Sequence, residues 1–591
     1  MAEYQAPVKD MLFVLKELAG LNEINKLPGF EEATEDLAEA VLEEAGQFAA
    51  GVVAPVNRIG DAEGTRVEDG GVRVPGAFAE AYRQFVDNGW GSLAQPPEFG
   101  GQGLPHLLGL AVEEMWQSAS LAWSLCPLLT QGAVRAIDAH ADAALKSRYL
   151  PKMVSGEWTG TMNLTEPQAG SDLSAVRTQA EPDGDAWRIT GQKIFITWGD
   201  HDMTENVIHL VLARLPDAPP GVKGISLFLV PKRLVGDDGS LGEPNRVHPV
   251  SVEHKLGIHG SPTCVMAFEG ALGYLVGPPH RGLACMFTMM NHARLGVGLE
   301  GVAIAERAYQ QAVAYARERV QGKVAGIEGR AAIVHHPDVR RMLMSMKSQI
   351  EAMRALAYVC AAHLDFAHAS PDPDQRAHHQ ARVDLLIPVV KGWSTETGQL
   401  LTSLAIQVHG GMGYIEETGV AQHFRDARIT TIYEGTTGIQ ANDLVGRKTL
   451  RDGGQAFRKL LDDMRATAAQ LAAAGGELAG LSPPLAQAID ALSGSLDWIL
   501  AEAASDPRLA GAASWHLLMQ TGITAGGWQL ARAAQAAARA LADGAADADF
   551  CRAKIHTARY YLLQHLPEAA AHGRALTGGS QAVMEQPEEL L

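Results

Sequence analysis

Apolar residues recur at helical spacing through the first part of the chain. In "FEEATEDLAEAVLEEAGQFAAGVV" (30–53), alanine, leucine and valine return every three or four positions with acidic residues between them, which is typical of an amphipathic helix. A Gly/Pro-rich stretch, "PPEFGGQGLP" (96–105), interrupts the helices, and a second helical run follows at 107–129. These patterns predict a helical domain over residues 1–158.

The pattern changes to short strands between residues 159 and 282. The runs "WRITGQKIFIT" (187–197), "VIHLVLARL" (207–215) and "GISLFLVPK" (224–232) are rich in β-branched residues, and Gly, Asp and Pro punctuate this part of the chain. Runs of this kind predict a small antiparallel β domain.

Helical patterns return after residue 282 and continue to the end of the chain. "LGVGLEGVAIAERAYQQAVAYARERVQGK" (295–323) predicts one long helix within a helical bundle over residues 283–451. An Ala-rich helical extension follows over residues 452–591. The expected fold is mainly α with a central β domain and an added helical extension, and 591 residues are enough for several cores.

Composition narrows the class of protein. The formal net charge is −19, and an acidic surface disfavours nucleic acid and anionic lipid. No run of about 18 apolar residues predicts a membrane span, and the N-terminus resembles neither a signal nor a transit peptide. Five scattered cysteines without a CxxC motif indicate reduced thiols and a cytoplasmic enzyme.

Two apparent motifs favour ordinary structure. "GVGLEG" (Gly296, Gly298, Gly301) matches a dinucleotide fingerprint, but it lies inside a helical pattern and lacks the strand that such a site needs. The adjacent histidine pairs at 335–336 and 378–379 lack a second set at metal-ligand spacing, so no metal site is expected. The nucleophile motif G-x-S-x-G is absent from the sequence.

Three other stretches occur in a characteristic order. They are "MNLTEPQAGSDLSAVRT" (162–178), "GQKIFITWGD" (191–200) and "IYEGTTGIQ" (432–440). Together they resemble the acyl-CoA dehydrogenase family over about residues 30–446, and the family fold matches the helical, β, helical order. The extension and the starting segment resemble a bacterial subgroup that includes 3-(methylthio)propionyl-CoA dehydrogenase.

The resemblance implies bound FAD. The hydroxyls and backbone N–H groups of the "LTEPQAGSD" loop are able to bind a flavin edge and a phosphate. On the "KIFIT" strand, Phe195 and Thr197 face the same side, and family analogy places Phe195 on the flavin face and Thr197 near N5. The cofactor-binding residues expected by resemblance in this subunit are Met162, Leu164, Thr165, Gly170, Ser171, Phe195, Thr197 and Thr436.

Three further residues resemble contacts to the FAD of a neighbouring subunit. They are Arg319, Gln407 and Gly411, and an arginine suits pyrophosphate because its planar fork pairs with two oxygens. The family pattern is one residue shorter after the arginine. These residues imply at least a homodimer.

A single carboxylate stands in the apolar run "ITTIYEGTTGIQ", and it is Glu434. The family requires a base for the α-proton of a thioester, and a minority of members carry it directly before the residue equivalent to Arg294, where this chain has Ala293. Glu434 is therefore the expected catalytic base. Desolvation strengthens a carboxylate as a base, and the resemblance implies transfer of the β-hydrogen to the flavin and a trans-2-enoyl-CoA product.

The same resemblance gives a set of substrate-binding residues. These are Ser171, Asn291, Arg294, Tyr433, Gly435 and Trp123. Asn291 replaces a common Asp beside the CoA-binding arginine, and Gly438 replaces a Gln that often touches FAD. The register of 112–129 places Trp123 at the acyl end, where it favours short or medium chains, although a core tryptophan fits the pattern equally well.

The substrate and the electron acceptor stay open at this stage. A short or medium-chain acyl-CoA and 3-(methylthio)propionyl-CoA both fit, with an electron-transfer flavoprotein as the expected partner. An acyl-CoA oxidase using O2 is the alternative from the same fold. A DNA-associated flavoprotein is disfavoured because the extension is slightly acidic. A lipid-anchored enzyme is disfavoured because the helix "WQLARAAQAAARALADG" (528–544) offers only two arginines.

Overall fold

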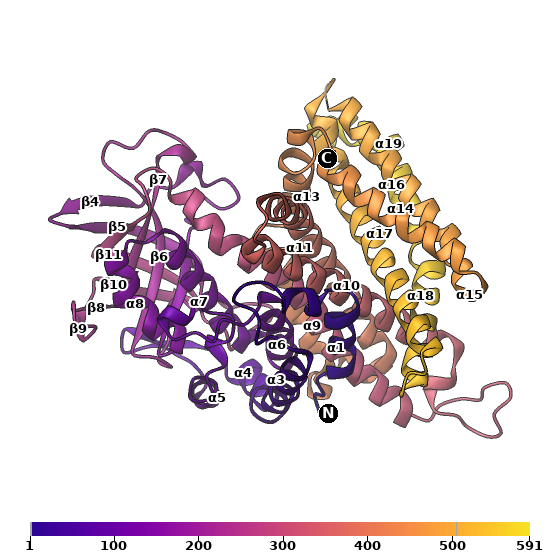
Figure 1. Ribbon diagram of the computed structural model, residues 1–591. Coiled ribbons are helices and arrows are strands. Elements are labelled where there is room, and N and C mark those ends of the chain that lie inside the picture. Colours follow the sequence, from indigo (N-terminus) through magenta and orange to yellow (C-terminus); the bar gives the residue numbers. More distant parts are fainter. Residues whose placement is uncertain (1–2, 504) are drawn as a thin grey trace. The chain divides into compact units, whose positions relative to one another are not determined.

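The computed structural model describes residues 3–503 and 505–591, which fold as two compact units. The β unit contains Ala45–Pro105 and Met115–Gly296. The helical unit contains the segments up to Glu44, His106–Glu114 and from Val297 onward. Figure 1 labels most of the elements of both units. Within the described residues, no helix is both long and apolar enough to cross a membrane.

A seven-stranded sheet forms the centre of the β unit. Five strands pair in the cyclic order β6, β7, β11, β5 and β4, and β4 touches β6 again at one residue pair. β3 pairs with β6, and β10 pairs with β11. The strands are β3 Trp158–Asn163, β4 Gln179–Asp183, β5 Ala186–Thr197, β6 Asn206–Arg214, β7 Ile225–Pro231, β10 Val247–Val252 and β11 Thr263–Val276, with β8 Arg233–Val235 and β9 Leu241–Pro244 as a separate pair.

The predicted β domain is confirmed, with one difference in strand direction. β3 runs parallel to β6, and β4 also runs parallel to β6 at its single pair. β3 ends beside Val211 of β6 and β4 begins beside Arg214, so the irregular loop at 164–178 leaves and rejoins the sheet near the same end of β6. Long loops without regular structure inside compact domains are commonly functional.

Helices and a small hairpin complete the β unit. The hairpin of β1 (Arg66–Glu68) and β2 (Gly71–Arg73) lies in the segment expected to be purely helical. The run at 107–129 is two helices, α6 and α7, because Ser120 adopts an extended conformation between them. The helices are α4 Ala54–Glu63, α5 Gly76–Asp87, α6 His106–Ala119 (its first part in the helical unit), α7 Leu121–His140 and α8 Ala143–Ser155.

Three long helices form the frame of the helical unit: α9 (Gly282–Glu318), α10 (Pro337–Ala369) and α11 (Pro373–His409). The "GVGLEG" stretch is helical as expected, and a Cβ at Gly301 would lie 2.3 Å from the carbonyl oxygen of Ser394. Its glycines therefore allow α9 and α11 to pack closely. The unit's helices outside the extension are α1 Val8–Glu17, α2 Leu21–Ile24, α9 Gly282–Glu318 (which begins in the β unit), α10 Pro337–Ala369, α11 Pro373–His409, α12 Val420–Ala427 and α13 Thr437–Asn442; α3, Glu35–Phe48, ends in the β unit.

The C-terminal extension is helical and packs on the same frame. α17 contacts α10, α11 and α13 as well as its neighbours in the extension. A Cβ at Gly522 of α17 would lie 2.2 Å from the Trp393 ring of α11, so the two helices lie close together. The extension contains α14 Gln455–Ala474, α15 Gly476–Ala479, α16 Ser482–Glu502, α17 Pro507–Ala542, α18 Ala548–Gln564 and α19 Pro567–Glu585.

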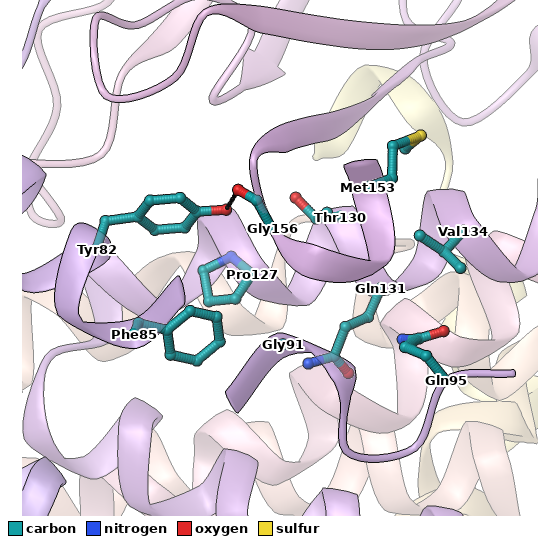
Figure 2. A pocket seen from close by; sticks show the side chains of 10 residues that line it. All are labelled: Tyr82, Phe85, Gly91, Gln95, Pro127, Thr130, Gln131, Val134, Met153 and Gly156. Atoms are coloured by element: carbon teal, nitrogen blue, oxygen red, sulfur yellow. Dashed lines mark hydrogen bonds between the residues drawn. The ribbon is translucent and has the colours of Figure 1, made fainter. Parts of the chain in front are cut away.

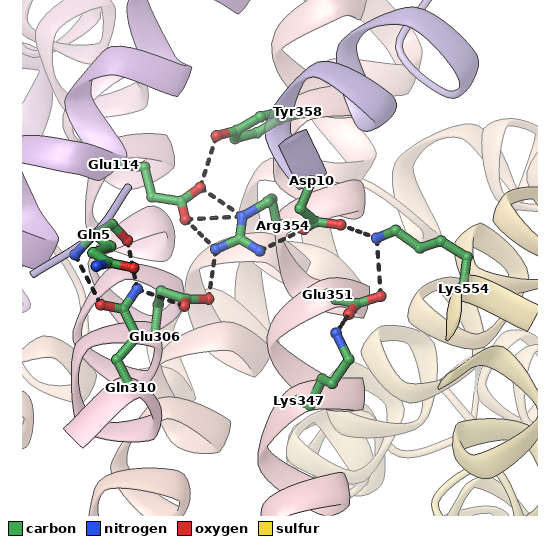
Figure 3. A network of polar contacts seen from close by, with 10 residues as sticks. All are labelled: Gln5, Asp10, Glu114, Glu306, Gln310, Lys347, Glu351, Arg354, Tyr358 and Lys554. Atoms are coloured by element: carbon green, nitrogen blue, oxygen red, sulfur yellow. Dashed lines mark hydrogen bonds and ion pairs between the residues drawn. The ribbon is translucent and has the colours of Figure 1, made fainter. Parts of the chain in front are cut away.

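A buried ionic network joins the first helix, the frame and the extension (Figure 3). Arg354 of α10 binds Glu114 at 2.6 Å, Glu306 at 2.9 Å and Asp10 of α1 at 2.6 Å. Lys554 of α18 contacts Asp10 and lies 3.0 Å from Glu351. Charged groups are stable in such an interior only when they are paired, so the network fixes α1 and α18 against α10.

Candidate active site

Glu166 connects the two sequence motifs that lie in the β unit, 162–178 and 191–200. Its carboxylate accepts hydrogen bonds from the Thr178 hydroxyl at 2.6 Å and from the Arg177 N–H at 2.8 Å, so it fixes the end of the 164–178 loop. It also binds Lys193 on β5, with 2.8 Å between Nζ and Oε1. Lys193 donates in addition to the Leu164 carbonyl at 3.0 Å. The loop and the strand are therefore one preformed structure.

The electrostatics of this pair favour the ionised form of Glu166. Burial raises the pKa of Glu166, but the Lys193 charge and the hydrogen bonds from Lys193, Thr178 and Arg177 outweigh it and lower the pKa to about 2. Burial lowers the pKa of Lys193 to about 8, against the opposing effect of Glu166. At neutral pH the pair is ionic.

Phe195 on β5 presents its ring to the exterior of the β unit. Its side chain is 58% exposed, and its backbone has φ +59°. A left-handed conformation is rare for a bulky residue, and such strained positions cluster at active and ligand-binding sites. Trp198 is also left-handed, with φ +53°, but it is buried. Trp198 is therefore part of the core, and the Phe195 ring alone offers a flat apolar face beside the 164–178 loop.

The other expected cofactor residues of the β unit lie around this loop. Gly170 and Ser171 are exposed, and Met162 and Leu164 pack against the core with part of their surface accessible. Thr197 pairs with Thr263 of β11 and is half-buried. The geometry thus brings together hydroxyls, backbone N–H groups and an aromatic face.

Trp123 on α7 is fully buried within an aromatic cluster. Its ring lies 5.5 Å from Phe85 and 6.3 Å from Tyr82, and its N–H donates to the Phe78 carbonyl at 3.2 Å. A small pocket next to this cluster is lined by Pro127 and other residues but not by Trp123 (Figure 2). The structure therefore places Trp123 in the core, and its effect on chain length stays a prediction.

Arg294, Asn291 and Ala293 lie on the part of α9 that belongs to the β unit. Arg294 is 5% exposed, and its guanidinium lies 5.8 Å from the Phe287 ring centre. Asn291 is half-buried.

In the helical unit, the third motif forms a tight turn between two short helices. A 3-10 turn ends at Thr431, and α13 begins at Thr437, where the Thr436 hydroxyl accepts the Ile439 N–H at 3.3 Å. Between them Glu434 has φ +54° and Gly435 has φ +91°. A left-handed glutamate needs support from its surroundings.

Three buried side chains hold this turn. Lys391 donates to the Gly435 carbonyl at 2.8 Å, and Gln440 donates to the Glu434 carbonyl at 3.0 Å. The hydroxyl of Tyr433 donates to Glu300 of α9. Sequence reasoning missed Lys391 and Glu300, although a charge inside "GLEGVA" or "VVKGW" on buried helices is a usable signal.

Glu300 has an unusual titration behaviour. Burial, helped by the nearby carboxylates of Glu113 and Glu434, raises its pKa to about 8 against the opposing effects of the Tyr433 hydrogen bond and the Lys391 charge. The pKa of Tyr433 is raised by burial and by Glu300. Glu434 is isolated along the sequence, but the fold surrounds it with other ionisable groups.

A hollow of about 530 Å³ lies at the end of α9 and α11. It is lined by Tyr315 and His409, which stack at 4.5 Å, and by neighbouring residues of both helices. Arg319, Gln407 and Gly411 are exposed in the segments that border it. Apolar side chains next to it are also exposed: Met412 at 51%, Tyr414 at 87% and Ile415 at 44%.

Gly438 is exposed at the start of α13. A Cβ there would meet only the Thr436 hydroxyl, at 3.8 Å. The site has room for a larger side chain, and nothing in the structure explains the glycine.

Family models match nearly the whole chain. The "Acyl-CoA dehydrogenase, N-terminal domain" covers residues 35–157, the "middle domain" 161–271 and the "C-terminal domain" 280–448. "Acetyl-CoA dehydrogenase C-terminal like" covers 460–587, the helical extension.

Relatives of known activity match over the full length. The chain is 49% identical to 3-methylmercaptopropionyl-CoA dehydrogenase of Ruegeria pomeroyi, covering 98% of this chain and 99% of that protein. It is 34% identical to a butyryl-CoA dehydrogenase of Syntrophomonas wolfei, covering 99% of each.

Solved structures show the same fold. Caenorhabditis elegans ACDH-11, solved in complex with C11-CoA, matches 98% of this chain and 97% of that one with a TM-score of 0.77 and 21% identity. Butyryl-CoA dehydrogenase of Megasphaera elsdenii matches 70% of this chain and 98% of its own, with a TM-score of 0.56 and 26% identity. The chain belongs to the acyl-CoA dehydrogenase family and is an oxidoreductase of this FAD-dependent class.

Proposed function

We propose that this acyl-CoA dehydrogenase converts a short or medium-chain acyl-CoA to the trans-2-enoyl-CoA with Glu434 as the base, and that 3-(methylthio)propionyl-CoA is its leading substrate candidate. The base assignment rests on one observation: Glu434 has a left-handed backbone in a turn held by three buried side chains. The substrate assignment rests on the 49% identical relative.

Glu434 performs the proton transfer in this proposal. Its carboxylate takes the α-proton of the thioester, and its backbone N–H donates to the thioester carbonyl oxygen, where negative charge develops. The adjacent Gly435, with φ +91°, keeps the turn free of a side chain. FAD, when bound, supplies the acceptor for the β-hydrogen as hydride.

The residues of the β unit fit a flavin. The exposed, left-handed Phe195 offers a flat apolar face, which suits the isoalloxazine ring. Hydroxyls of Thr165, Thr197 and Ser171 stand on the same loop and strand, where they offer hydrogen bonds to a flavin edge and a phosphate. Met162, Leu164 and Gly170 complete this proposed site.

The helical unit offers groups for the FAD of a second copy. Arg319, Gln407 and Gly411 are exposed around the hollow at the end of α9 and α11. The apolar side chains of Met412, Tyr414 and Ile415 beside it suit a protein interface. We propose a homodimer, with Thr436 contacting the FAD of its own subunit.

Substrate-binding roles follow from the same family pattern. Arg294 and Asn291 are proposed to contact CoA, with Ser171, Tyr433 and Gly435 near the thioester and Trp123 limiting the acyl end. The hydroxyl of Tyr433 points inward to Glu300, so any contact to substrate must come from its ring. An electron-transfer flavoprotein is the proposed electron acceptor.

An anaerobic titration tests this proposal. The purified enzyme is mixed with 3-(methylthio)propionyl-CoA or with straight-chain acyl-CoAs, and loss of the flavin absorbance near 450 nm reports reduction. Glu434→Gln should bind acyl-CoA and fail to bleach. Bleaching at a near-normal rate in this variant would remove Glu434 from the mechanism, and rapid hydrogen peroxide formation in air would indicate an oxidase.

A further inference from the structure

One of the three side chains that hold the turn around Glu434 is a carboxyl, Glu300, which has no part in the proposed reaction. Glu300 is fully buried on α9 and accepts the hydroxyl hydrogen bond of Tyr433, the residue directly before Glu434. Its other oxygen, Oε1, has no hydrogen-bond partner among the described residues. An unsatisfied buried carboxyl oxygen costs free energy, so the presence of a glutamate at this buried position suggests a function.

Glu300 is not itself placed to act as a base. Its side chain has no solvent-accessible surface and lies beneath Tyr433. A substrate carbon must come within direct reach of a proton acceptor, and a buried oxygen behind a tyrosine is out of that reach. Any effect of Glu300 on the reaction must therefore pass through Tyr433.

We propose that Glu300 is a positioning residue: through Tyr433 it holds the turn in the left-handed conformation that presents the Glu434 carboxylate to the substrate. This role rests on the proposed function in one respect, because it takes Glu434 as the base. Lys391 and Gln440 hold the two carbonyls that follow, so the turn is fixed at three consecutive residues.

The charge state of Glu300 suits this role at neutral pH. The ionisable groups that face it are Glu113 of α6, Lys391 of α11, and Tyr433 and Glu434 of the turn, while Asp426 faces Tyr433. With its pKa raised to about 8, chiefly by burial, Glu300 is mainly neutral at pH 7. It then anchors Tyr433 without adding a second negative charge beside the base.

Ionisation of Glu300 should disturb the turn through its charge, although it strengthens the hydrogen bond from Tyr433. Above pH 8 a buried carboxylate would face Glu113 and Glu434 with one lysine to offset it. Such a charge favours water entry or movement of the turn. The expected result is a fall in turnover as pH rises through about 8, because the base loses its placement.

The test compares Glu300→Leu, Glu300→Gln and Tyr433→Phe with wild type. Each is assayed with 3-(methylthio)propionyl-CoA and an artificial electron acceptor between pH 6 and pH 9.5. Glu300→Leu and Tyr433→Phe should lower kcat at least about tenfold, with KM changed less than about threefold. Glu300→Gln keeps the acceptor, so it should recover most of kcat and lack the alkaline fall.

Tyr561→Phe is the matched control for loss of a buried tyrosine hydrogen bond. Tyr561 is 1% exposed and donates to the Ile523 carbonyl at 3.0 Å within the extension, so its loss should lower the melting temperature without changing kcat. FAD content and melting temperature are measured for all variants, and kcat is given per bound flavin, so that unfolding is not counted as loss of turnover.

Two outcomes would overturn the positioning role. One is a kcat within about twofold of wild type in Glu300→Leu and Tyr433→Phe, and the other is the same alkaline fall in wild type and Glu300→Gln. Glu434→Gln keeps this result separate from the base assignment. An inactive Glu434→Gln with unaffected Glu300 variants rejects the positioning role alone, whereas an active Glu434→Gln rejects the base itself.

Discussion

Lys193 and Glu166 form a buried ion pair with 2.8 Å between Nζ and Oε1, and this pair fastens the 164–178 loop to β5. The two residues come from different sequence motifs, 27 positions apart. Their contact gives a physical reason for the two motifs to occur together: the loop and the strand share one electrostatic anchor.

Removal of one partner should destabilise the β unit. Lys193→Met leaves the Glu166 carboxylate buried without its cation, which typically costs about 3–5 kcal/mol. The free energy of unfolding measured in urea and the FAD content of the purified protein should both fall. Arg83→Ala, at an exposed pair with Glu80, is the control and should leave the stability nearly unchanged. Wild-type stability in Lys193→Met would contradict the anchoring role.

The stability of the fold should depend on Glu166 in acid. Its folded-state pKa of about 2 lies below the ordinary value of 4.5, so the ionised form stabilises the fold above about pH 4.5, and the contribution is lost as pH falls toward 2. In urea titrations between about pH 5 and pH 3, wild type should lose more unfolding free energy than Glu166→Gln. If the unfolding free energies of wild type and Glu166→Gln change in parallel with pH, the pKa of Glu166 is not lowered by folding.

Phe195 should matter for flavin binding more than for folding. Phe195→Gly removes the exposed ring and suits the backbone at φ +59°, so the apoprotein should melt at or above the wild-type temperature while its affinity for FAD falls at least about tenfold. Phe195→Tyr keeps a flat ring and should retain FAD. Normal FAD affinity in Phe195→Gly would exclude the ring as a flavin contact.

Trp123 offers a test of chain-length selection. Trp123→Ala should shift the preferred acyl-CoA to longer chains if the ring limits the acyl end, and its burial beside Phe85 and Tyr82 predicts a loss of stability of about 3–5 kcal/mol. Trp123→Phe is the milder control. An unchanged chain-length profile in a folded Trp123→Ala would assign Trp123 to the core alone.

The network around Arg354 predicts strong coupling between distant segments. Arg354→Met leaves Glu114, Glu306 and Asp10 without their shared cation, at a cost of about 3–5 kcal/mol. The exposed pair of Arg559 and Glu477 supplies the control, since Arg559→Ala should cost less than about 1 kcal/mol. Equal unfolding midpoints for the two variants would argue against a structural role for the network.

Local patterns predicted most of the fold. The alternation in 187–197 and the apolar runs at 207–215 and 224–232 became β5, β6 and β7, because side-chain burial in a sheet repeats every two residues or covers both faces. The hairpin at Arg66–Arg73 lies in a segment predicted to be helical, although "EDGG" between "TRV" and "VRV" is a turn signal flanked by β-branched residues. The break between α6 and α7 at Ser120 was not predicted because the extended backbone there has no strong sequence marker.

The support of the site was harder to predict than the site itself. The motifs pointed directly to Glu434 as the candidate base, whereas its supporting contacts join distant positions: Glu300 and Tyr433 are 133 positions apart, and Lys391 and Gly435 are 44 apart. Contacts of this kind depend on how α9 and α11 pack, and helical periodicity indicates only that a residue is buried. The parallel pairing of β3 with β6 likewise depends on the path of residues 164–205 between them, and neither strand alone indicates it.

The contact between α1 and α18 has a consequence during protein synthesis. Asp10 and Lys9 of α1 pair with Lys554 and Asp547, and the Phe13 ring packs edge-on against Phe550 with 5.6 Å between ring centres. A ribosome adds only about 5–20 residues per second, so α1 must wait roughly half a minute or longer for these partners. α1 also packs against α2 and α10, which are made earlier, so the surface of α1 that faces α17 and α18 should stay uncovered until the last helices of the chain are made.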